Sequence, residues 1–168
     1  DVALHIGTFV ALICYFYKDI HGLILGILGK NDQARLAWLL VFATLPAVVG
    51  GYLLQDLAES SFRSPSLVAI NMIWVAVMMI IAENYSDTKK KKTTLNKTSA
   101  KQGMAIGFAQ VIALVPGASR SGSTITVGIF AGLDRVSATR FSFLLAIPIT
   151  LGAIVKVMLS SENITQLD

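Results

Sequence analysis

Small and hydroxyl-bearing side chains surround a single arginine in the segment Pro116–Thr124, which reads Pro-Gly-Ala-Ser-Arg-Ser-Gly-Ser-Thr. Arginine presents a planar fork of donors that suits phosphate oxygens, and glycine lets a backbone turn tightly and approach a ligand closely. A helix that begins near Ser121 would add free N–H groups and the positive end of its dipole. These residue types together favour the binding of an anion, and most of all of a phosphate.

The same segment has a purely structural alternative. Its hydroxyl side chains are also good helix caps, and Arg120 could snorkel or pair with an acid elsewhere. Against this alternative, no acid lies inside any apolar stretch of the chain. An unpaired arginine at mid-membrane costs about 2.5–3.5 kcal/mol even on lenient insertion scales. The segment also lacks the Gly-Lys-Ser/Thr ending of a Walker A loop, and it contains no metal ligand.

Membrane helices are expected to hold this segment. Hydrophobic residues make up 54% of the 168 positions and charged residues only 14%, whereas about a quarter of a soluble domain is charged. A helix needs about 20 apolar residues to cross the hydrocarbon core, so the second, third and fifth apolar stretches are predicted to be full spans. The five stretches are Val2–Tyr17, Leu36–Leu54, Ser66–Ala82, Gly103–Leu133 and Ala138–Leu159. The composition therefore predicts an all-α, polytopic membrane helix bundle.

The fourth stretch is long but interrupted. Its first part, Gly103–Val115, would form about 20 Å of helix, which passes the midplane without crossing the membrane. Pro116 and Gly117 stop that helix, and Ser121–Leu133 can form a second short one. This pattern predicts a broken or re-entrant helix pair that meets at the Pro116–Thr124 loop. Such backbone survives at membrane depth only where it is buried in protein or lines a wet cavity.

Lysines indicate the orientation in the membrane. Six of them lie in the segment Glu83–Gln102, and the connection between the first two spans carries Lys18, Lys30 and Arg35. The positive-inside rule places both segments in the cytoplasm. The lysine-rich loop 83–102 is interpreted as a solvated linker, with contact to anionic lipid headgroups as the alternative. Nucleic-acid binding is not expected, because no aromatic residues alternate with these lysines.

Between Gly107 and Pro148 the sequence resembles a known family. The runs that carry the resemblance to bacterial undecaprenyl-pyrophosphate phosphatase, the bacitracin-resistance protein, are Phe108–Gln110, Ala113–Thr124, Gly132–Arg135 and Ala138–Pro148. The run His5-Ile6-Gly7-Thr8 is similar to an early span of that family, and the resemblance is weak over Asp56–Lys101.

The resemblance implies an enzyme of the bacterial inner membrane that hydrolyses undecaprenyl pyrophosphate to undecaprenyl phosphate and phosphate, and so recycles the cell-wall lipid carrier. It also implies an inverted repeat with two re-entrant segments, so residues 1–168 are interpreted as a single transmembrane domain and a fragment of a larger fold. The residues predicted to be catalytic are Ser119, Arg120 and Thr124. Those predicted to bind substrate are Gly117, Ser121, Gly122 and Ser123.

The family's second re-entrant segment carries acidic residues, a serine and a histidine. We therefore expect a divalent cation, Mg²⁺ or Ca²⁺, whose ligands lie outside this chain, and we expect the fragment alone to be inactive. The expected partners are a polyprenyl pyrophosphate lipid and the bilayer, and a homo-oligomer is left open. Two alternatives remain: a transporter or binding protein for an anionic phosphorylated lipid that uses the same broken helix, and a purely structural helix bundle. Acids supplied before Asp1 would favour the enzyme.

Overall fold

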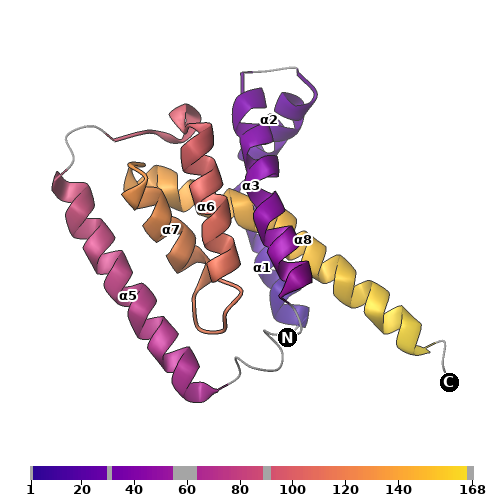
Figure 1. Ribbon diagram of the computed structural model, residues 1–168. Helices are drawn as coiled ribbons and strands as arrows, with labels where there is room; N and C mark the ends of the chain where they lie inside the picture. The colour runs from indigo at the N-terminus through magenta and orange to yellow at the C-terminus, as the bar shows by residue number, and fades with distance from the viewer. Residues whose placement is uncertain (1, 30–31, 55–63, 89–91, 166–168) are drawn as a thin grey trace.

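The computed structural model describes residues 2–29, 32–54, 64–88 and 92–165, and its regular structure is helical. Along the chain the elements are α1 (Val2–Tyr15), α2 (Tyr17–Ile27), α3 (Ala34–Leu53), α5 (Pro65–Thr88), the short 3₁₀ helix η1 (Leu95–Lys97), α6 (Ala100–Ile112), α7 (Arg120–Phe130) and α8 (Arg135–Thr165). The short pair α6 and α7 lies between α5 on one side and α3 and α8 on the other (Figure 1).

Three helices are long and apolar enough to cross a membrane, namely α3, α5 and α8. They correspond to the second, third and fifth apolar stretches, so the predicted all-α membrane bundle is confirmed. Both α3 and α8 continue through an internal proline, Pro46 and Pro148 respectively. The helix α5 begins at Pro65 and extends to Thr88, so it includes the first residues of the predicted 83–102 loop.

The first apolar stretch is not a straight span. The helices α1 and α2 meet at Phe16 with a bend of 79°, and only together are they long and apolar enough to cross a membrane. Lys18 and Asp19 suggested a polar connection here, but the segment is helical because Ile20 and Leu23 pack against the core. The Phe16 ring at the bend is buried and lies 6.3 Å from the ring of Phe143 on α8.

Close contact between α3 and α6 forms the centre of the bundle. Gly103 and Gly107 lie on the face of α6 that meets α3, where a Cβ on Gly107 would overlap the Ala43 backbone and one on Gly103 would lie 2.5 Å from Leu39 Cδ1. Small residues let two membrane helices approach in this way, and the approach strengthens van der Waals packing. This contact fixes α6, and with it the first arm of the broken pair.

A group of hydrogen bonds closes the open end of the α6–α7 pair. Thr93 N–H donates to Gly132 O at 2.8 Å, and Asp134 N–H donates to Thr93 O at 3.1 Å. The Gln102 side chain donates to Ala131 O at 2.9 Å. These bonds tie the end of the lysine-rich loop to the turn between α7 and α8. The pair therefore enters and leaves the bundle on the lysine-rich side, as a re-entrant segment must.

The N-terminus of α6 carries a capping box that gives the first testable prediction. Ser99 Oγ accepts from Gln102 N–H at 3.3 Å, and Gln102 Oε1 accepts from Ser99 N–H at 2.8 Å. Because loss of such a cap costs about 1 kcal/mol, Ser99→Ala should lower the unfolding midpoint in detergent. Thr94→Ala is the matched control, since Thr94 makes no side-chain cap bond to η1. Equal midpoints for the two variants would show that the box contributes nothing.

Candidate anion-binding site at the re-entrant loop

The loop between α6 and α7 turns back sharply at Gly117. This residue has φ +87°, and a Cβ there would lie 2.5 Å from Val68 O on α5. Only glycine adopts this conformation without strain and allows that approach. The Asn71 side chain, also on α5, donates to Pro116 O at 2.9 Å. The first turns of α5 therefore hold the tip of the loop in place.

Ser119 caps the start of α7. Its Oγ accepts from Gly122 N–H at 3.2 Å, and its carbonyl accepts from Ser123 N–H at 2.9 Å. The second of these is the first bond of the helical ladder, so within the first turn of α7 the N–H groups of Arg120 and Ser121 have no partner among the residues described. The two groups are adjacent and lie at the positive end of the α7 dipole, which is a favourable position for an anion.

Two of the predicted site residues have their hydroxyls engaged inside the protein. Ser123 Oγ donates to Ala118 O at 2.8 Å. Thr124 is only 1% exposed, and its Oγ1 lies 2.6 Å from Ser142 Oγ on α8 and 2.8 Å from Arg120 O. Gly122 is buried as well, against Val75 of α5. These three residues support the loop from its buried side, whereas Ser119 and Ser121 are exposed at its surface.

Arg120 is the cation of the site and is partly buried. Its Nη2 donates to Thr150 Oγ1 on α8 at 3.3 Å. Within the described ranges no carboxylate pairs with it. The ion pairs found there join Arg135 to Glu83 and Asp87, and Arg140 to Asp19. Arg135 and Arg140 lie in the first turns of α8, at the lysine-rich end, so those acids leave the charge of Arg120 uncompensated.

Taken together, the loop presents a guanidinium, two free backbone N–H groups and two exposed hydroxyls around one turn. A guanidinium that is half withdrawn from water and has no counter-ion gains most from a bound anion. Paired oxygens suit its fork of donors. The sequence predicted this group of residues, and the structure brings Ser119, Arg120 and Ser121 to the surface of one turn.

A metal site is a separate question, because the resemblance implies a divalent cation. In the part of the chain that the structure describes, no three side chains from His, Cys, Asp and Glu lie close enough together to hold a metal ion. Hard cations such as Mg²⁺ and Ca²⁺ need oxygen ligands, chiefly carboxylates. The described residues thus do not form such a site by themselves, and the cation with ligands elsewhere stays a prediction.

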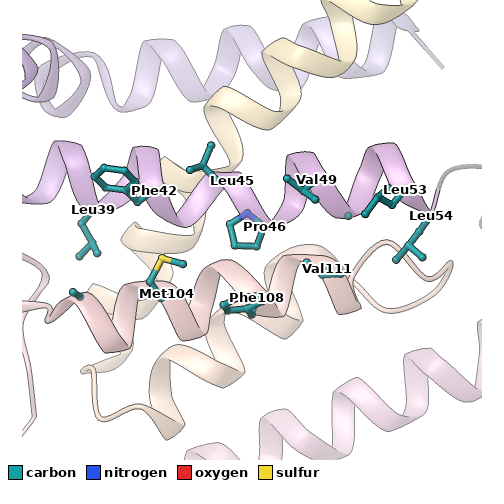
Figure 2. Close-up of a pocket in the computed structure, with 12 residues that line it drawn as sticks. Leu39, Phe42, Leu45, Pro46, Val49, Leu53, Leu54, Met104, Phe108 and Val111 are labelled. Atoms are coloured by element: carbon teal, nitrogen blue, oxygen red, sulfur yellow. The ribbon is translucent and has the colours of Figure 1, made fainter.

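One large cavity is lined by no residue of the Pro116–Thr124 loop. It is a groove of about 690 Å³ between α3 and α6, and its lining includes Phe42, Pro46, Met104 and Phe108 (Figure 2). Side chains of this kind offer no donor or nucleophile. In Figure 2, Met104 points from α6 toward α3, and Leu39 and Pro46 point from α3 toward α6. The groove is therefore an apolar surface and not the site of the chemistry.

The chain matches a known protein family over its whole length. The sequence model of that family, described as bacitracin resistance protein BacA, matches residues 1–168. The chain belongs to the BacA family. A BacA-family relative from Moorella thermoacetica, an undecaprenyl-diphosphatase, is 39% identical over 155 residues, which are 91% of this chain and 58% of the relative. The undecaprenyl-diphosphatase of Rubrobacter xylanophilus is 43% identical over 162 residues, which are 91% of this chain and 58% of the relative. The undecaprenyl-diphosphatase of Idiomarina loihiensis is 38% identical over 172 residues, and the match covers 98% of this chain and 64% of the relative.

This BacA-family chain spans about 60% of the length of the curated relatives that it matches. Its three long apolar helices indicate a multi-pass membrane protein, and its relatives are bacterial. Family membership confirms the resemblance found in the sequence.

Three polar residues that contact the site were missed in the sequence: Asn71, Ser142 and Thr150. Asn71 and Thr150 are isolated polar side chains in apolar stretches, whereas Ser142 follows Thr139 and Arg140 near the start of α8. Isolated polar residues are uncommon at membrane depth and tend to hydrogen-bond across helices. That signal could have identified Asn71 and Thr150 as contacts of the loop, but not Ser142.

Proposed function

We propose that the full-length protein hydrolyses undecaprenyl pyrophosphate to undecaprenyl phosphate and phosphate, and that the loop Pro116–Thr124 holds the pyrophosphate. The observation that carries the proposal is the Arg120 guanidinium, placed without a described counter-ion beside the free N–H groups that open α7. The names of the relatives, undecaprenyl-diphosphatases, support the same substrate.

The chemistry assigns a role to each part of the loop. Hydrolysis of a pyrophosphate leaves charge on the departing phosphate, and fixed donors stabilise that charge. Arg120 binds the pyrophosphate oxygens, while the N–H groups of Arg120 and Ser121 complete the cradle. The exposed Ser119 hydroxyl orients a phosphate oxygen. Thr124 acts from beneath, because its buried hydroxyl fixes the first turn of α7 against α8.

Ser119 is not assigned as the nucleophile. A serine needs an adjacent base, and no carboxylate or imidazole contacts it among the residues that the structure describes. We expect the nucleophile, the base and the cation ligands to come from residues outside this chain, as the resemblance implies. On the same ground we expect the isolated 168-residue chain to be inactive.

One observation favours a second function. The loop supplies donors for an anion but no described base, which would also fit a protein that binds or transports a phosphorylated lipid. Phosphate release from C55 or C15 pyrophosphate by the full-length protein in detergent separates the two. Release that depends on added Mg²⁺ or Ca²⁺ supports the enzyme. Saturable binding of the lipid without any release would support the binding protein instead.

The lysine run Lys89–Lys92 is expected to be dispensable for the chemistry. The described part of its loop is tied to the turn between α7 and α8, at the opposite end of α7 from Arg120. Replacing the four lysines with glutamine should leave phosphate release within a few-fold of wild type, although the orientation in the membrane can suffer. A loss of several orders of magnitude, with correct topology shown by cysteine labelling, would contradict this assignment.

A further inference from the structure

Two hydroxyls on α8 contact the two ends of the first turn of α7. Thr150 accepts from Arg120 Nη2 at 3.3 Å, and Ser142 lies 2.6 Å from Thr124 Oγ1. Thr150 and Ser142 are eight residues apart on one helix and are each 5% exposed. A separation of eight residues is close to two helical turns, so both side chains face the same side of α8. This side of α8 therefore forms a wall of the anion site.

From this geometry we infer that Thr150 positions the Arg120 guanidinium for the pyrophosphate. The inference rests on the proposed function of the loop and adds a residue that acts through Arg120, without touching the substrate. Thr150 lies near the middle of α8, and threonine is stiff at χ1, so its oxygen is a fixed acceptor. A fixed acceptor orders the arginine side chain before the substrate binds. The side chain then loses less conformational entropy when the pyrophosphate arrives.

The neutral character of Thr150 matters for this role. A carboxylate at the same place would hold Arg120 more firmly, but it would also cancel the charge that the pyrophosphate needs. A hydroxyl occupies one of the five guanidinium N–H donors and leaves the charge and the other donors available. The structure describes no acid beside Arg120. Thr150 therefore orients the guanidinium without neutralising its charge.

The test compares Thr150→Val and Thr150→Ser in the full-length protein. Valine keeps the shape and removes the acceptor, so kcat for phosphate release should fall about tenfold. Serine keeps the acceptor and should retain most of the wild-type rate. A role in packing alone predicts the opposite order, because valine fills the space of threonine and serine leaves a gap.

Thr126→Val is the matched control. Thr126 is also 5% exposed, and its hydroxyl has no partner among the residues described. The same exchange there removes no hydrogen bond, so it should leave kcat unchanged. A tenfold loss in Thr126→Val as well would show that any buried threonine exchange disturbs the enzyme, and the inference would fail.

A second measurement tests whether Thr150 acts through Arg120. Binding of a methylene-bisphosphonate analogue of farnesyl pyrophosphate should weaken in Thr150→Val, but the same exchange should have no effect in an Arg120→Ala background. Equal weakening in both backgrounds, or wild-type kcat in Thr150→Val, would overturn the inference while leaving the proposed function intact. Absence of phosphate release from the wild-type protein would refute the proposed function itself, and the inference with it.

Discussion

Arg120→Ala should abolish phosphate release from prenyl pyrophosphate by the full-length protein, with a loss of about a thousandfold or more. The expected size follows from the effect of removing a donor or an arginine that stabilises a phosphoryl-transfer transition state. In the described structure the guanidinium has one hydrogen-bond partner, Thr150. Removing a partly desolvated charge with so few contacts should leave the fold intact. Phosphate release and the unfolding midpoint, measured on the same preparation, separate these two effects.

Arg120→Lys is expected to be almost as poor. A lysine keeps the positive charge, but an ammonium is a point donor and does not reproduce the planar fork that binds two oxygens. A lysine variant with near-normal turnover would show that charge alone suffices, and near-normal turnover in Arg120→Ala would remove Arg120 from the site altogether.

Gly117→Ala should have the second largest effect. The residue has φ +87°, and a Cβ would approach the backbone of Val68 on α5 to 2.5 Å. The left-handed conformation costs a non-glycine residue about 1–3 kcal/mol, and the contact with backbone atoms adds to it. The turn must therefore move, and a displacement of about 1 Å in a catalytic loop can cost about a hundredfold in rate. Phosphate release and thermal unfolding should both fall.

Gly51→Ala is the control for this exchange. Gly51 lies in α3, and a Cβ there would meet nothing within 4 Å. Alanine is the better helix former, so the variant should be as stable as wild type or slightly more stable. If Gly117→Ala behaved like Gly51→Ala in both assays, the loop would not need the turn that the structure shows.

The broken helix pair was predictable because local chemistry dictates it. Pro116 removes a backbone donor and Gly117 permits the left-handed turn, so the apolar stretch around them could not form one straight span. The predicted arms Gly103–Val115 and Ser121–Leu133 differ from α6 and α7 by only a few residues at each end. The prediction that Arg120 binds an anion rests on the same local argument.

The roles of the hydroxyls were not predictable in this way. In the sequence Thr124 and Ser119 are equally good ligands for a phosphate. The structure separates them, because Thr124 is buried against Ser142 while Ser119 is exposed at the turn. Which hydroxyl is buried depends on the packing of α7 against α8. This tertiary packing cannot be predicted from the local sequence.

The bend at Phe16 was missed for a related reason. The charges of Lys18 and Asp19 suggested a loop after the first stretch, yet α2 forms there because its apolar side finds a partner in the core. Short helices of this kind depend on tertiary packing more than on their own propensity. The sequence therefore predicted the long spans and the broken helix pair, whereas the bend and the burial of individual hydroxyls depend on packing.

The central claim is that the loop at the start of α7 holds the pyrophosphate of a prenyl lipid. The most direct measurement is the binding of a non-hydrolysable methylene-bisphosphonate analogue of farnesyl pyrophosphate to full-length wild-type protein and to folded Arg120→Ala, by isothermal titration in detergent. We expect saturable binding to wild type and a loss of affinity of about tenfold or more in the variant, because charge-assisted contacts to Arg120 are removed. Equal affinity of the two proteins for the analogue would contradict it.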